Sequence, residues 1–304
     1  MIRYGTNPIA WANDDDRSIG ADIPTEQILR EAGEEIGFDG IENGHRWPDD
    51  PAELKAMLGR YGLKFIGGWY STALLARSLD DEIAAFQPHL ARLKHNGCKV
   101  SITCETSNAI HGDASKPLSA RPRLSPAEMQ EFGAKIEAFA EYVERQGLNL
   151  VYHHHMGTVV ESPGEIDAFM AATGPATKLL FDAGHCFFGG GDPAKVLKKH
   201  AARVRHFHAK NVRPEVMRRA RAEGWSFLRA VVEGVFTVPG DAEGGVDFPP
   251  LLQILAGAGY EGWLVIEAEQ DPAVRNPLEY QRLGLGSLKA MARAAGLDSA
   301  AEGG

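Results

Sequence analysis

Cysteine is scarce in this sequence. Its 304 residues include only Cys98, Cys104 and Cys186, an odd number without a CxxC pair. Such a set builds no disulfide framework and fits a reducing cytoplasm. The first residues, MIRYGTNPIAW, lack the charged start and apolar core of a signal peptide, and no apolar run approaches the roughly 18 residues of a membrane helix. We therefore expect a soluble, cytoplasmic chain without a membrane partner.

Positive charge is also in the minority. The chain has 32 Lys and Arg against 41 Asp and Glu, a formal net charge of -9, which disfavours a nucleic-acid partner because such proteins need a basic face. No GxGxxG loop follows the first apolar run, and GxSxG and HExxH motifs are absent. These absences disfavour a dinucleotide-binding open sheet, a serine hydrolase and a metalloprotease.

Short apolar runs alternate with helical patterns along the chain. Eight runs have strand character: 2–11, 38–44, 63–71, 98–107, 148–155, 177–185, 204–212 and 263–270. Helical patterns lie between them, at 24–37, 125–147, 162–174, 192–204 and 247–262. This series predicts an α/β fold, a single (β/α)8 TIM barrel over 1–294. A loop-helix insertion is expected at 213–246, after the seventh strand, and a flexible tail at 295–304.

Ionisable residues collect at the predicted carboxyl ends of the strands, where the active site of such a barrel lies. Seven of the eleven histidines fall between positions 153 and 208. Burying so many ionisable groups is costly without partners, and a divalent cation is the simplest shared counter-charge. The strand-end residues are Asn7, Trp11, Glu42, Trp69, Tyr70, Glu105, the run from His153 to His155, Asp182, His185, His206, His208, Lys210, Glu267 and Glu269.

Each of these residues also has a structural interpretation, which the sequence leaves open. The histidine run is compatible with a surface loop, and Asp182 with the N-cap of a helix. The remaining structural alternatives are core histidines for His206 and His208, packing beneath a loop for His185, ion pairs for Glu42 and Glu105, an exposed strand end for Glu267 and the surface for Lys210.

Several longer stretches carry a family resemblance. They include YHHHMGTVVE (152–161), FDAGHCFFGGGDP (181–193), HFHAKNVR (206–213) and GWLVIEAEQDPAVRNPLEY (262–280). With them the chain resembles the xylose isomerase-like sugar isomerase and epimerase barrels and, within these, the inosose dehydratase family. The resemblance implies removal of water from 2-keto-myo-inositol (scyllo-inosose) to give a trihydroxycyclohexane-1,2-dione. It also implies Mn²⁺ or Co²⁺, and an association with glutathione for which the sequence shows no site.

The resemblance further implies a metal site. The superfamily holds its ion with Glu, Asp, His and Glu at four strand ends, and Asp182, His208 and Glu267 fall on the last three. His153 stands at the first position in place of glutamate; His155 or Glu105 is the alternative ligand there. Imidazole ligands suit Mn, Co, Fe or Zn ions better than Mg²⁺.

Elimination of water from a polyhydroxy ketone needs a stabilised enolate and two proton transfers. We assign the proton transfers to His155 and His185, with Glu269 as a third candidate, and expect Lys210 to steady the enolate oxygen. The expected substrate-binding residues are Asn7, Trp11, Glu42, Trp69, Tyr70, Glu105, His154 and His206.

Rival interpretations share parts of this site. A sugar or cyclitol isomerase or epimerase would use the same enolate, and a non-catalytic cyclitol-binding barrel would need fewer buried charges. A metal-dependent endonuclease is disfavoured by the net charge of -9. A small polyhydroxy ketone is the expected partner, and the apolar-rich insertion is compatible with a homo-oligomer.

Overall fold

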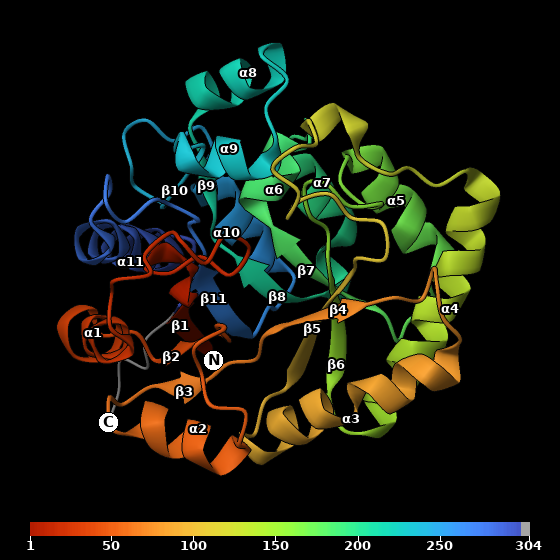
Figure 1. Ribbon diagram of the computed structural model, residues 1–304, viewed down its shortest axis with the longest axis horizontal. Helices are drawn as coiled ribbons and strands as arrows, with labels where there is room; N and C mark the ends of the chain where they lie inside the picture. The colour runs from red at the N-terminus through yellow and green to blue at the C-terminus, as the bar shows by residue number, and fades with distance from the viewer. Residues whose placement is uncertain (299–304) are drawn as a thin grey trace.

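The computed structural model describes residues 1–298, and one curled parallel sheet lies at its centre (Figure 1). The strands of this sheet are β1 (Ile2–Thr6), β2 (Gly40–Ile41), β3 (Lys64–Phe65), β4 (Trp69–Thr72), β5 (Val100–Glu105), β6 (Asn149–His153), β7 (Lys178–Asp182), β8 (Val204–His208) and β11 (Gly262–Ile266). They are hydrogen-bonded in the order β3-β2-β1-β11-β8-β7-β6-β5-β4. The predicted parallel α/β architecture is confirmed.

The two edge strands, β3 and β4, come from one predicted strand, 63–71. Two glycines interrupt it: Gly67 has φ +151°, and a Cβ at Gly68 would lie 2.2 Å from Cβ of Asn43. β3 pairs with β2, whereas β4 pairs with β5. Because consecutive stretches of chain form both edges, the sheet curls round on itself. The eight predicted strand positions are therefore all present, with the third one split.

Helices surround the sheet, as Figure 1 shows. They are α1 (Thr25–Arg30), α2 (Pro51–Gly59), α3 (Leu79–His95), α4 (Pro126–Arg145), α5 (Pro163–Ala172), α6 (Ala183–Phe188), α7 (Pro193–His200), α10 (Phe248–Gly257) and α11 (Pro277–Ala294). Short helical turns are η1 (Pro8–Ala10), η2 (Glu31–Ile36, a π-helical turn), η3 (Leu118–Ala120) and η4 (Ala201–Arg203). Ser125 caps α4 in a reciprocal pair with Glu128, as its position before Pro126 predicts.

The insertion after β8 has its own small fold. It contains β9 (Asn211–Val212), α8 (Pro214–Ala222), α9 (Phe227–Val232) and β10 (Phe236–Thr237). The strands β9 and β10 pair antiparallel. The predicted single helical pattern is two helices, because Gly224 takes a left-handed conformation (φ +64°) between them. Phe227 and Phe236 pack with Phe188 of α6, which fixes the insertion over that side of the barrel.

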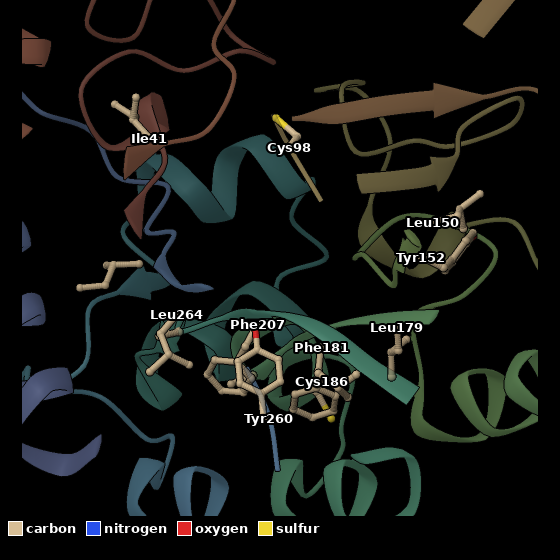
Figure 2. Close-up of a cluster of buried hydrophobic side chains, with 14 of the residues drawn as sticks. Ile41, Cys98, Leu150, Tyr152, Leu179, Phe181, Cys186, Phe207, Tyr260 and Leu264 are labelled. Carbon is tan, nitrogen blue, oxygen red and sulfur yellow. The ribbon is translucent and has the colours of Figure 1, made fainter. Parts of the chain in front are cut away.

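Apolar side chains on the outer face of the strands form the main core. Phe181 and Phe207 stack with ring centroids 6.1 Å apart, and Figure 2 shows them in one cluster with Leu264. All three are fully buried, and burying such a side chain contributes about 1.5–3 kcal/mol. Alternate residues of a strand face opposite sides, so the neighbours Asp182 and His208 face the inside of the barrel.

The end of the described chain follows α11 closely. The hydroxyl of Tyr4 donates a hydrogen bond to Asp298 Oδ2 at 2.7 Å, and the amide of Leu297 donates to the carbonyl of Ala292. Residues 295–298 therefore contact the barrel, and 299–304 lies outside the described residues. The flexible tail expected at 295–304 stays a prediction. Within residues 1–298, each helix is too short or too polar to cross a bilayer.

Candidate active site

Four buried side chains meet at the carboxyl ends of neighbouring strands. His153, Asp182 and His208 end β6, β7 and β8, and Glu267 follows β11. Each offers one donor atom, and these atoms lie within 4.8 Å of one another. The sheet register explains the meeting, since Asp182 is paired with His208 and His208 with Val265. We call these four residues the metal group.

The donor atoms of the metal group lack hydrogen-bond partners among residues 1–298. They are His153 Nε2, Asp182 Oδ2, His208 Nδ1 and Glu267 Oε2. His208 Nδ1 lies only 2.6 Å from Glu267 Oε2 and 3.4 Å from Asp182 Oδ2, yet neither contact has hydrogen-bond geometry. Unpaired buried polar atoms are costly, and a shared cation removes that cost. Two imidazoles and two carboxylates therefore fit a divalent ion.

Local hydrogen bonds orient the ligands. Asp182 Oδ1 accepts the backbone N–H of His185 at 2.7 Å and caps α6, which leaves Oδ2 free. Both sequence-based interpretations of Asp182 therefore apply to one side chain. Glu42 Oε1 lies 3.1 Å from His208 Nε2 and 2.7 Å from His206 Nε2. A carboxylate behind a ligating histidine fixes its tautomer and ring orientation.

Charges around the metal group favour its ionised carboxylates. Burial alone would raise the pKa of Asp182, but its electrostatic interactions with His185 and Lys210 outweigh burial and hold the pKa well below its usual range. Glu267 follows the same pattern, with Lys210 and His208 lowering its pKa against burial. Anionic carboxylates are the form that binds a cation.

A second group lies beside the first and contains the predicted proton-transfer residues. The ring centroids of His155 and His185 are 3.8 Å apart. Lys210 Nζ lies 2.9 Å from His185 Nε2 and donates to Glu269 Oε1 at 2.7 Å. Phe227 of the insertion packs on both imidazoles, with centroids 5.1 and 6.1 Å away. We call His155, His185, Lys210 and Glu269 the proton-transfer group.

Burial dominates the protonation of this group. It lowers the pKa of His155 well below its ordinary value, and neighbouring positive charges act in the same direction. For Glu269, burial raises the pKa to about 7, an effect that Lys210 opposes and that Glu267 and Asp15 reinforce. A neutral imidazole therefore lies close to a carboxyl that exchanges its proton near neutral pH.

A cavity of about 240 Å³ opens onto both groups. Its lining includes eight of the predicted site residues: Asn7, Glu42, Trp69, His153, His155, His208, Glu267 and Glu269. The ring of Trp69 meets those of His153 and His155 edge-on, at centroid distances of 5.3 and 5.2 Å. Asn7 Nδ2 donates to Glu42 Oε2 at 2.9 Å. The cavity lining therefore combines the indole ring of Trp69 with hydrogen-bonding side chains.

Two aromatic residues predicted to contact substrate lie elsewhere. Trp11 is fully buried and donates from Nε1 to Glu31 Oε2 at 2.6 Å. The hydroxyl of Tyr70 donates to Glu82 Oε1 at 2.7 Å, and its ring packs in the helical layer. Tyr70 follows Trp69 in β4 and faces the opposite side of the strand. Trp11 and Tyr70 are thus absent from the cavity lining, and their expected part in substrate binding stays a prediction.

Three polar residues predicted to bind substrate also lie outside the cavity lining. His154 faces outward, packs on Phe181, and its Nε2 accepts the N–H of Asp182 at 3.2 Å. His206 lies outside the cavity lining and contacts Glu42 instead. Glu105 accepts hydrogen bonds from Thr72 and Ser107, among other groups, at the ends of β4 and β5. These contacts are structural, and Glu105 is absent from the group of donor atoms that contains His153.

The cavity also has lining residues that the sequence patterns did not indicate. Asp14 and Asp15 come from the segment after η1, and His111 from the segment after β5. His111 Nε2 lies 4.0 Å from Asp15 Oδ1, and its ring centroid is 5.8 Å from that of Trp69. The acidic run at 14–16 is the only sequence signal for this part of the cavity, and for His111 we find none.

Comparisons with known proteins agree with this geometry. The family model for the xylose isomerase-like TIM barrel matches residues 31–291. The rhizopine catabolism protein MocC of Rhizobium meliloti is 45% identical over 97% of this chain and 90% of its own length. An inosose dehydratase of Geobacillus thermodenitrificans is 42% identical over 92% of this chain and 93% of its own length.

Solved structures show the same fold. The IOLI protein, whose crystal structure contains a zinc atom, superposes with a TM-score of 0.68 at 11% identity, over 96% of this chain and 99% of that one. An L-ribulose 3-epimerase superposes with a TM-score of 0.67 at 16% identity, over 100% of both chains.

Proposed function

The chain belongs to the xylose isomerase-like TIM barrel family, and from this premise we propose that it is a metal-dependent inosose dehydratase. This carbon–oxygen lyase would remove water from 2-keto-myo-inositol to give a trihydroxycyclohexane-1,2-dione. The observation that carries the proposal is the metal group, with its unpaired donor atoms, next to a proton-transfer group in one small cavity. The inosose dehydratase relatives, matched over most of their length, support the reaction.

The metal group would hold one divalent ion. Its mixed nitrogen and oxygen donors suit Mn²⁺ or Co²⁺ better than Mg²⁺, which prefers oxygen ligands. When bound, such an ion stabilises negative charge on the carbonyl oxygen of the substrate while the adjacent carbon loses its proton. The four side chains that would hold the ion are buried, at most 6% exposed.

His155 is the proposed general base. Its Nδ1 lies 2.8 Å from the carbonyl oxygen of Met156. Because a carbonyl only accepts, Nδ1 carries the proton of the neutral ring and Nε2 is left as the acceptor. His155 also lines the cavity. Its lowered pKa keeps it neutral at cellular pH, the form that takes the proton beside the substrate carbonyl.

Glu269 is the proposed general acid. It lines the cavity, and its Oε2 has no hydrogen-bond partner among residues 1–298. A pKa of about 7 leaves a protonated fraction available to the departing hydroxyl. His185 lies outside the cavity lining and contacts Lys210, which donates to Glu269. His185 and Lys210 would therefore position the acid, and His185 would not itself touch the substrate.

Two alternatives share this site. An isomerase or epimerase would return the proton instead of expelling hydroxide. Two solved epimerases, an L-ribulose 3-epimerase and a D-allulose 3-epimerase, are 16% and 17% identical to this chain, which supports only a shared fold. Action on a rhizopine-derived compound is favoured by the 45% identity to MocC, close to the 42% of the inosose dehydratase. The test therefore includes one candidate substrate for each of these two relatives.

The test is a dehydration assay on metal-free protein. Chelator-stripped protein receives scyllo-inosose, or rhizopine in a parallel series, with Mn²⁺, Co²⁺, Mg²⁺ or no metal, while the ultraviolet absorbance of the dione is followed. We expect dione from scyllo-inosose with Mn²⁺ or Co²⁺. Solvent exchange of the proton beside the carbonyl, without dione, would contradict the dehydratase and favour the isomerase.

Two expectations from the sequence stay predictions. Cys186, the thiol next to His185, is fully buried, and burial raises its pKa far above the ordinary value. The structure thus gives glutathione no accessible thiol there, and its association rests on the family resemblance alone. A homo-oligomer is likewise a prediction.

A further inference from the structure

The proton-transfer group has the chemistry of a second metal site. His155, His185 and Glu269 each offer one donor atom, and these three atoms lie within 4.8 Å of one another. All three side chains are buried. Two nitrogens and one carboxylate oxygen are ligands that the same divalent transition ions accept. Two-metal sites with ions about 3.5–4 Å apart are common in hydrolytic enzymes. The donor atoms alone are therefore compatible with either one or two bound ions, and another residue must determine the number.

Lys210 lies between this trio and the metal group. Its ammonium nitrogen is 2.7 Å from Glu269 Oε1, 2.9 Å from His185 Nε2 and 3.3 Å from Glu267 Oε2. The same nitrogen lies 3.9 Å from Asp182 Oδ2 and 4.5 Å from the ring centroid of Phe236. Lys210 is fully buried. One positive charge thus faces carboxylates of both groups and the electron-rich face of an aromatic ring.

The chain makes room for the lysine stem at one glycine. A Cβ on Gly184 would lie 2.5 Å from Cγ of Lys210, and 2.9 and 3.0 Å from its Cβ and Cδ. Gly184 has a negative φ, because it is absent from the glycines with positive φ. Its backbone conformation therefore does not demand glycine. The close approach of Lys210 gives the physical reason for a glycine in the DAGH stretch, and it shows that α6 accommodates this side chain.

We propose that the Lys210 ammonium takes the place of a second divalent cation, so that the chain binds one ion and keeps His155 and Glu269 free to move protons. This inference rests on the metal site of the proposed function. The carboxyl groups of Asp182, Glu267 and Glu269 carry at most three negative charges, which one divalent ion and one ammonium already balance. A second divalent ion in the trio would bring two more positive charges against Lys210 at short range.

Metal stoichiometry tests the inference without relying on turnover. The wild-type chain and Lys210→Met are loaded with Mn²⁺, freed of excess ion by gel filtration, and measured by mass spectrometry of the metal and by electron paramagnetic resonance. For wild type we expect about one Mn²⁺ per chain with the signal of an isolated ion. For Lys210→Met we expect about two, with the signal of a spin-coupled pair.

Two control variants sharpen the result. Lys199→Met removes an exposed lysine, paired with Asp167 at 2.7 Å, and should stay at the wild-type count. Adding Glu269→Gln to Lys210→Met removes the carboxylate of the trio and should return the count to that of wild type. Circular dichroism checks that each variant is folded, and Lys210→Gln replaces Lys210→Met if the latter does not fold.

The outcomes separate this inference from the proposed function. Two coupled ions in wild type, or a single ion in a folded Lys210→Met chain, would overturn the role of Lys210 and leave the metal group standing. No Mn²⁺ in wild type would overturn the metal site itself, and with it both proposals.

Discussion

The floor and the rim of the cavity are built differently. The floor consists of His153, His208 and Glu267, which are at most 6% exposed and stand at strand ends. The rim consists of Asp15 and His111, whose side chains are 28% and 15% exposed and meet only at 4.0 Å. Sheet register holds the floor, whereas two loops hold the rim. The comparison suggests that the floor carries the chemistry and that the rim adjusts access and charge.

The largest expected effect follows from removing a ligand of the floor's ion. Asp182→Asn keeps an oxygen for the His185 N–H but loses the charge, so turnover should fall at least about 10³-fold as Lewis-acid stabilisation is lost. Titration calorimetry with Mn²⁺ and steady-state kinetics measure this. Asp182→Ala also removes the cap of α6 and should cost about 1 kcal/mol more in thermal or denaturant unfolding. Full Mn²⁺ affinity in Asp182→Asn would exclude Asp182 as a ligand.

Glu269 joins the floor to the rim, because Asp15 helps to raise its pKa to about 7. An acid must be protonated to act, so turnover should decline as pH rises through about 7. Glu269→Gln should lower turnover about 10²-fold and abolish this limb of the pH profile. Asp15→Asn removes a charge that raises the pKa of Glu269, so the limb should move to lower pH while the maximal rate persists. If turnover of Asp15→Asn declined at the same pH as that of wild type, Asp15 would have no electrostatic effect on Glu269.

A smaller effect is expected behind the floor. Glu42→Gln replaces the carboxylate that orients His208 with an uncharged amide. Mn²⁺ affinity, measured by calorimetry, should therefore fall about 10–100-fold. Glu105→Gln is the matched control, since Glu105 is also a buried strand-end carboxylate but bonds to Thr72 and Ser107. It should lower stability and leave Mn²⁺ affinity unchanged. Equal losses in both variants would mean that Glu42 acts through the fold alone.

The sequence predicted the floor far better than the rim, for a physical reason. Strand parity and the ends of apolar runs locate Asp182, His208 and Glu267, because register carries neighbouring strand ends to one place. The same parity separates His153 from His154, which faces the helices. Strand parity did not predict the position of His206, which faces inward with His208 but contacts Glu42 and is absent from the cavity lining. The alternation of residues along a strand predicts which face a side chain lies on, but not how far along the barrel axis it lies.

Loops give no such signal. The segment carrying Asp15 and the segment carrying His111 are brought together by contacts 96 positions apart in the chain, and no periodicity of the sequence indicates that meeting. The split of the predicted strand 63–71 was missed for a related reason. The glycines at 67 and 68 are visible in the sequence, but the close approach of Asn43 that requires one of them is a tertiary contact.

The smallest effect should come from the rim itself. His111→Phe keeps an aromatic ring against Trp69 and His155 but loses the imidazole that faces Asp15. A partly exposed contact at 4.0 Å between an imidazole and a carboxylate contributes at most about 1 kcal/mol, so KM should rise no more than about fivefold. Turnover number and Mn²⁺ affinity should stay near wild type, because the floor is untouched. A tenfold or larger fall in kcat at unchanged KM and metal content would instead mean that His111 handles a proton, and the rim would then belong to the chemistry.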